Sequence, residues 1–325
     1  MKKSSRLFPA FVLIALLALM LFHADLVTEG ARNGLLLWYS AVVPALFPFM
    51  VLSGLIVSSG GIRMLTAPFH FFLGPLFRLS SSGIYVLITG LLCGYPMGAK
   101  TCGDFLRQGQ ISLREGRFLM AVCNHPSPMF ILGFAWPLLE KESSLPAFLF
   151  SIYGPLLLLF PLSAFFCSRF PADRKPGFSD GICPADPGHE HRLSGDEIIL
   201  NAAETLCRIG GCLMLFSIGV LFIQECTFLP GLLRFLLTGS MEMTTGVRTL
   251  SEVLPSPLSG ASVCAALSFG GFSGIAQTQA VLGGEKNAGL SIRHYFLWKL
   301  LHGILSFLFF LFTVRPFPGI PLLFP

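Results

Sequence analysis

The clearest candidate for ligand chemistry is a lysine that follows a break in an apolar run. Residues 91–104 contain Gly94, Pro96 and Gly98 within five positions, and Lys100 follows at once. Proline removes a backbone donor and glycine lowers helix stability, so one continuous helix is not expected here. A lysine at membrane depth is costly unless it meets an anion or a water-filled cavity. We therefore expect Lys100 to recognise an anion, with an interfacial lysine that reaches the headgroups as the alternative.

A second broken apolar stretch, residues 258–282, repeats part of this pattern. Residues 271–278 match residues 94–101 at glycine, aromatic, alanine and threonine positions. The polar side chains there include Ser273, Gln277 and Thr278, which could hydrogen-bond a ligand or satisfy backbone groups that the break leaves open. Both interpretations stay open at this stage.

Asn124 and Ser127 are polar residues in an otherwise apolar segment, beside Pro126 and Pro128. Unpaired polar groups in such surroundings need a partner or a ligand. Helix capping by Asn124 is the alternative.

Glu242 is followed by Thr244 and Thr245 and is preceded by a glycine. A carboxylate inside a membrane protein can relay a proton or a cation. A carboxylate at the positive end of a helix is also stabilising, so helix capping explains the residue as well.

The candidate substrate-binding residues are Tyr95, Lys100, Thr101, Asn124, Ser127, Glu242, Thr244, Thr245, Ser273, Gln277 and Thr278. The sequence contains no Ser/His/Asp spacing, no metal-ligand cluster and no phosphate-binding loop. We therefore expect no enzyme activity, no catalytic residues, no metal and no cofactor. Cys183, His189 and His191 fit no standard zinc spacing and are interpreted as part of a solvated loop.

Membrane-spanning helices must position these residues. The chain has 325 residues, of which 53% are hydrophobic and 12% charged, with a mean hydropathy of +0.73. Soluble domains carry about 25% charged residues. Several apolar runs approach the ~20 residues that span a bilayer. The composition predicts an all-α polytopic protein of the cell membrane, with the lipid bilayer as a partner. The net charge of +5 then reflects orientation in the membrane, and no nucleic-acid partner is expected.

The first apolar run, residues 7–22, follows Lys2, Lys3 and Arg6 and is interpreted as a retained signal anchor with a cytoplasmic N-terminus. A polar turn is expected at Asp25, Glu29 and Arg32, and an amphipathic interfacial segment at residues 62–80. The further predicted spans are residues 35–57, 118–139, 145–167, 206–223 and 295–314. The predicted organisation is an anchor and turn (1–32), a first repeat with a linking span (33–167), a cytoplasmic polar linker (168–204) and a second repeat (205–325).

The positive charges give the two repeats opposite orientations. If both broken stretches are re-entrant hairpins, most Lys and Arg residues lie in the cytoplasm, including Lys100, Arg107, Arg114 and Arg117. The second hairpin then opens from the other face. Such an inverted repeat, whose broken hairpins meet within the membrane, is typical of transporters.

Five motifs together resemble the YlbJ family of sporulation integral membrane proteins: Leu46-Phe47-Pro48-Phe49, Gly94-Tyr95-Pro96-Met97-Gly98-Ala99-Lys100, Asn124…Ser127-Pro128, Glu242-Met243-Thr244-Thr245-Gly246 and Gly271-Phe272-Ser273-Gly274. The resemblance extends from about residue 33 to the C-terminus. His125 departs from the family pattern, where a small polar residue is expected. The family carries the nucleoside recognition (Gate) domain, similar to half of a concentrative nucleoside transporter core.

The resemblance implies a membrane protein that moves a small molecule during sporulation, with the dianion dipicolinate as the natural candidate. The expected function is transport of a small organic anion, by a chain that could form a homo-oligomer. Two alternatives stay open: a non-transporting membrane factor of the spore envelope, and a nucleoside or nucleobase carrier.

Overall fold

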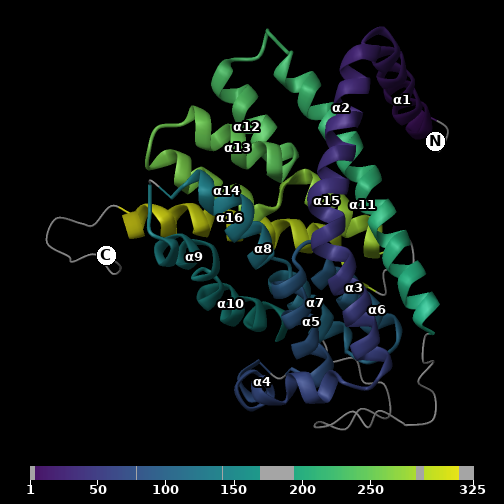
Figure 1. Cartoon of the computed structure of the whole chain (residues 1–325), viewed down its shortest axis with the longest axis vertical. Coiled ribbons are helices and arrows are strands. Elements are labelled where there is room, and N and C mark those ends of the chain that lie inside the picture. The colour runs from purple at the N-terminus through teal and green to yellow at the C-terminus, as the bar shows by residue number, and fades with distance from the viewer. Residues whose placement is uncertain (1–3, 78, 141, 169–193, 283–288, 315–325) are drawn as a thin grey trace, which may run out of the picture.

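The protein is built from helices (Figure 1). The computed structural model describes residues 4–77, 79–140, 142–168, 194–282 and 289–314, and every regular element in these ranges is helical. Five helical stretches are long and apolar enough to cross a membrane: Ala24–Ser58, Leu145–Cys167, Gly195–Gln224, Leu258–Leu282 and Ile292–Val314. The predicted class, an all-α polytopic membrane protein, is confirmed.

The helices in chain order are α1 (Ser4–Phe22), α2 (Ala24–Leu37), α3 (Val43–Ser58), α4 (Ile62–Phe77), α5 (Ser81–Cys93), α6 (Met97–Arg107), α7 (Leu113–Val122), α8 (Pro128–Phe130), α9 (Leu145–Tyr153), α10 (Leu156–Ser168), α11 (Gly195–Gln224), α12 (Gly231–Met241), α13 (Met243–Val253), α14 (Leu258–Phe269), α15 (Gly271–Leu282) and α16 (Ile292–Val314). A π-helical turn at Trp38–Val42 joins α2 to α3, and short π and 3-10 turns follow α8.

One local prediction is wrong and another is confirmed. The predicted polar turn around Asp25 and Glu29 lies inside α2, which packs along α11. A Cβ atom at Gly30 would lie 2.6 Å from the Ile218 Cα atom, so glycine lets the two backbones touch and the tertiary contact keeps this segment helical. The interruption that the sequence predicts near the start of the span 118–139, at residues 124–128, is confirmed, because α7 ends at Val122 and α8 begins only at Pro128.

The predicted linker at 168–204 is partly helical. α11 begins at Gly195, and Ser194 and Glu197 form a reciprocal capping box at its N-terminus. Cys183, His189 and His191 lie outside the described residues.

The first predicted hairpin is present, but the second predicted hairpin does not form at residues 258–282. α5 packs along α6 after a turn at residues 94–96, whereas α14 and α15 do not pack along each other. Gly270 and Gly271 have φ angles of 81° and 70°, which glycine adopts readily and which turn the chain between these two helices. α15 leaves to pack against α11 and α6. The prediction of a hairpin at 258–282 is therefore wrong, and the second hairpin is α12–α13, which turns at Glu242.

The two hairpins share a pair of facing glycines. A Cβ atom at Gly98 would lie 2.9 Å from the Gly90 Cα atom, and one at Gly246 would lie 2.6 Å from the Gly239 Cα atom. In both hairpins the missing side chains let the two helices approach to backbone contact.

A charged pair also recurs two residues after the second glycine of each hairpin. Lys100 pairs with Asp104 at 2.8 Å, and Arg248 pairs with Glu252 at 3.4 Å, both one helical turn apart. α12 and α13 lie in the upper half of Figure 1, and α5 and α6 lie in the lower half. α12–α13 thus shares two local features with α5–α6, the facing glycines and the charged pair.

Candidate functional site

A pocket forms where both hairpin turns meet both helix breaks. Gly94 and Tyr95 line it from the first hairpin turn, and Glu242 from the second. Ser127 lines it from the α7–α8 break and Gly270 from the α14–α15 break. The cavity volume is about 100 Å³, and its remaining lining is mainly apolar.

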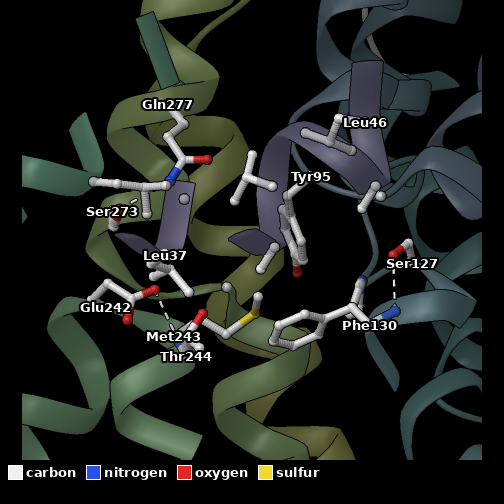
Figure 2. A pocket seen from close by; sticks show the side chains of 18 of the residues that line it. Leu37, Leu46, Tyr95, Ser127, Phe130, Glu242, Met243, Thr244, Ser273 and Gln277 are labelled. Atoms are coloured by element: carbon white, nitrogen blue, oxygen red, sulfur yellow. Dashed lines mark hydrogen bonds between the residues drawn. The ribbon is translucent and has the colours of Figure 1, made fainter. Parts of the chain in front are cut away.

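Six of the predicted substrate-binding residues line this pocket: Tyr95, Ser127, Glu242, Thr244, Ser273 and Gln277. Figure 2 shows Glu242, Ser273 and Gln277 on one side and Tyr95 and Ser127 on the other. The predicted residues Lys100, Thr101, Asn124, Thr245 and Thr278 do not belong to the lining.

Glu242 begins α13 and caps it. Its carboxylate accepts hydrogen bonds from the backbone amides of Thr244 (2.9 Å) and Thr245 (2.7 Å), and only 2% of the residue is exposed. The carboxylate satisfies two of the amides that open a helix and lies at the helix's positive end. The capping alternative is thereby confirmed, whereas a relay by Glu242 stays a prediction.

Ser273 and Gln277 lie one turn apart on α15 and are both buried. The Gln277 side-chain amide donates to the Ser273 hydroxyl at 3.0 Å. This bond uses the amide nitrogen of Gln277 and not its side-chain carbonyl oxygen. That oxygen can therefore still accept a hydrogen bond at the pocket wall.

Tyr95 joins the first hairpin to the second helix break. Its hydroxyl donates to the backbone carbonyls of Leu267 (3.2 Å) and Ser268 (2.9 Å), near the end of α14. A Cβ atom at Gly270 would lie 2.8 Å from the Tyr95 ring, so glycine makes room for the aromatic face. The two parts of the chain that the sequence predicts to converge are in direct contact here.

Ser127 and Asn124 cap two different helices. The Ser127 hydroxyl accepts from the Phe130 amide at 3.2 Å and caps α8. The Asn124 side-chain oxygen accepts from the Ala99 amide at 2.9 Å, so Asn124 caps α6 from across the hairpin. The Asn124 side-chain amide donates to the Tyr295 hydroxyl at 3.1 Å and approaches the Thr278 hydroxyl at 3.5 Å. Asn124 and Thr278 therefore form a network behind the pocket wall.

Lys100, the first candidate from the sequence, lies outside the pocket wall. Its ammonium pairs with Asp104, which also accepts from Arg107, and its side chain is 21% exposed. Anion recognition by Lys100 stays a prediction.

Sequence reasoning missed a buried cation, Lys299 on α16. Lys299 is 1% exposed, and its ammonium donates to the Asn124 backbone carbonyl at 2.7 Å. It lies 4.8 Å from the centroid of the Tyr95 ring, the ring that lines the pocket. His302, one turn further along α16, lies 3.4 Å from the ammonium. A lysine and a histidine three positions apart in the apolar run 295–314 are a signal that could have identified this site.

The fold defines the chain as a polytopic helical membrane protein, and a pocket lies at the helix breaks of the described residues. The sporulation integral membrane protein YlbJ of Bacillus subtilis (strain 168) is 26% identical to this chain over an alignment of 348 positions that covers 97% of the chain and 84% of the relative. The similarity supports the resemblance to the YlbJ family that the motifs predict. No family model and no solved structure matches the chain.

Proposed function

We propose that the chain is a transporter of a small organic anion that acts in the membrane during sporulation, with dipicolinate as the first candidate substrate. The link to sporulation comes from the relative named sporulation integral membrane protein. The transport proposal comes from the site.

The observation that carries the proposal is the convergence of two hairpin turns and two helix breaks on one pocket. Interrupted backbone at membrane depth is tolerated only where protein buries it or it lines a cavity. Broken helices that meet at a shared site are typical of secondary transporters, in which they supply polar backbone groups to a substrate.

An anionic substrate is supported by helix ends and by a buried cation. α6, α13 and α15 all begin at the pocket, and the N-terminus of a helix carries a partial positive charge. The carboxylate of Glu242 already occupies the end of α13, and the Asn124 side-chain oxygen caps α6, which leaves α15 as the favourable end. The Lys299 ammonium lies directly behind the Tyr95 ring.

The paired hairpins support alternating access. Each has facing glycines and its own ion pair. They lie in opposite halves of the molecule in Figure 1, and residues at both of their turns line the pocket. An inverted repeat of this kind would let either hairpin open the same site to its own side of the membrane.

A nucleoside or nucleobase carrier is the second candidate. The Tyr95 ring could stack on a base, and Glu242 and Gln277 could accept its hydrogen bonds. The same pocket thus offers chemistry for a neutral heterocycle, which makes a direct comparison of substrates necessary.

Flux of radiolabelled dipicolinate and uridine into proteoliposomes tests the proposal. We expect saturable dipicolinate uptake that exceeds uridine uptake and the uptake of protein-free liposomes. Gln277→Ala removes a pocket side chain, and Gln279→Ala removes the same group from an exposed position of the same helix. Gln277→Ala should weaken uptake and Gln279→Ala should not. Preference for uridine would favour the carrier of nucleosides, and uptake of neither substrate by correctly inserted protein would refute transport of both.

A further inference from the structure

Three basic side chains are buried together behind the pocket wall. Lys299 and His302 are each 1% exposed, and His125 is 3% exposed. The Lys299 ammonium lies 3.4 Å from His302 Nδ1, and the rings of His302 and His125 lie 5.4 Å apart between centroids. We call these three residues the basic cluster.

The cluster has backbone partners on most of its nitrogens. His302 Nε2 bonds the Ile152 carbonyl at 2.9 Å, and His125 Nε2 bonds the Val122 carbonyl at 2.6 Å. Among the residues that the structure describes, His125 Nδ1 is buried and has no hydrogen-bond partner. A buried nitrogen without a partner is costly, and a bound water would satisfy it; a proton could bind there only with an acceptor for the new N–H, which the same water could supply.

No carboxylate neutralises the cluster among the described residues. The other titratable groups that face it, from α16, the α7–α8 break, α9 and the first hairpin turn, are Tyr295, Cys123, Tyr153 and Tyr95. Tyrosine and cysteine are neutral at ordinary pH. Like charges this close in a buried site disfavour each other, so the three side chains cannot all be positively charged at once. One charge shared among Lys299, His302 and His125 is the state that the geometry supports.

We propose that Lys299, His302 and His125 form a proton-binding site, and that one proton held there is the coupling ion of transport. This inference rests on the proposed transport function and adds the identity of the ion to it. Chains of buried histidines and other ionisable groups serve as proton relays in pumps and transporters.

The contacts of Lys299 provide the link between proton and substrate. Its ammonium bonds the Asn124 carbonyl at the first helix break and faces the Tyr95 ring at the first hairpin turn. A proton on the cluster puts positive charge behind the ring that lines the pocket and so stabilises an anion in front of it. Loss of that proton removes the stabilisation. One proton therefore enters the cluster with each anion from one side, and both leave to the other side with no bond formed or broken other than N–H.

Proteoliposomes that contain the full chain and a trapped pH-sensitive dye test the coupling. With the membrane potential clamped, a gradient of about one pH unit can accumulate a ligand about tenfold if one proton moves with it. We expect radiolabelled dipicolinate to accumulate when the outside is acidic, and inward dipicolinate flux to acidify the lumen. Dipicolinate exchange at equal pH on both sides requires no net proton movement and measures substrate binding and access separately.

The variants assign the proton to the cluster. His302→Gln leaves the Lys299 charge in place and should lose gradient-driven accumulation while exchange continues, so that internal dipicolinate only equals the external concentration. Lys299→Met should lose accumulation and also weaken exchange, because it removes the charge beside the Tyr95 ring. Arg293→Met removes an exposed cation from the same helix, and His70→Gln removes an exposed histidine on α4; both should keep the wild-type accumulation.

Wild-type exchange without accumulation or acidification would overturn the inference and leave transport standing. Proton-driven accumulation that survives in both Lys299→Met and His302→Gln would also overturn it. Absence of wild-type exchange would overturn the proposed transport function, and the coupling with it. The dye measurement on the wild-type protein decides the coupling even if a variant does not fold.

Discussion

Replacing Gly90 by alanine should open the first hairpin, because this glycine has no room for a side chain. A Cβ atom at Gly90 would lie 1.7 Å from the Cys123 carbonyl oxygen and 3.1 Å from the Gly98 Cα atom. Both neighbours are backbone atoms, so no side chain can rotate away and the segment that carries Asn124 must move.

The size of the effect follows from two opposing contributions. Overpacking a tight interior costs about 1–3 kcal/mol, and a contact this short lies at the upper end of that range. Replacing glycine by alanine inside a helix returns about 1 kcal/mol. The expected net loss for Gly90→Ala is about 2 kcal/mol of the free energy of unfolding. Gly211→Ala on α11 is the matched control, since its Cβ atom would meet nothing within 4 Å. That control should keep the gain of about 1 kcal/mol.

Thermal unfolding of the purified protein in detergent, at one fixed heating rate, measures the difference. Gly90→Ala should lower the unfolding midpoint by roughly 4 °C relative to the wild type, while Gly211→Ala should not lower it. Gly246→Ala should behave like Gly90→Ala, because its Cβ atom would lie 2.6 Å from a backbone carbon of the second hairpin. A Gly90→Ala midpoint as high as that of Gly211→Ala would refute the packing reasoning, and an unaffected Gly246→Ala would refute the equivalence of the two hairpins.

Three further predictions address the junction, pH and topology. Tyr95→Phe keeps the ring but removes the hydroxyl that donates to the Ser268 carbonyl at the end of α14, and should lower the free energy of unfolding by about 1 kcal/mol in the same assay. An unchanged midpoint would show that this hydroxyl does not stabilise the contact between the first hairpin turn and α14. Glu115 lies outside the five candidate spans; burial raises its pKa above the ordinary value, and the hydrogen bonds from Ser80 oppose this only in part. A raised pKa in the folded state means that folding takes up a proton. The wild type should therefore gain stability relative to Glu115→Gln as pH falls from neutral toward the ordinary carboxyl pKa. A constant difference in stability across that pH range would contradict this prediction. A single cysteine at Ser112 should react with a membrane-impermeant reagent only from the cytoplasmic side, and labelling from outside would overturn the predicted orientation.

The sequence by itself was sufficient for the class of protein and for three sites of interruption, at residues 94–98, 124–128 and within 258–282. Low charge content and long apolar runs favour insertion into the bilayer, because the free energy of transferring a segment from water to lipid depends on its composition. That free energy does not depend on which residues later pack against the segment. The break before Lys100 is also local, because proline and glycine act on their own helix turn. Six of the predicted binding residues line the pocket for the same reason, since polar groups beside breaks are where a cavity can form.

The tertiary structure decided which charged and polar groups work together. Lys100 satisfies its charge within one helical turn, while Lys299 finds its partner 175 residues away at Asn124. Asn124 in turn caps a helix that begins 27 positions earlier, at Met97. The second hairpin lies at α12–α13 because paired glycines allow two helices to touch, and only folding shows which glycines face each other. Local propensity is a property of neighbours in sequence, whereas a buried donor or charge takes the partner that packing brings to it.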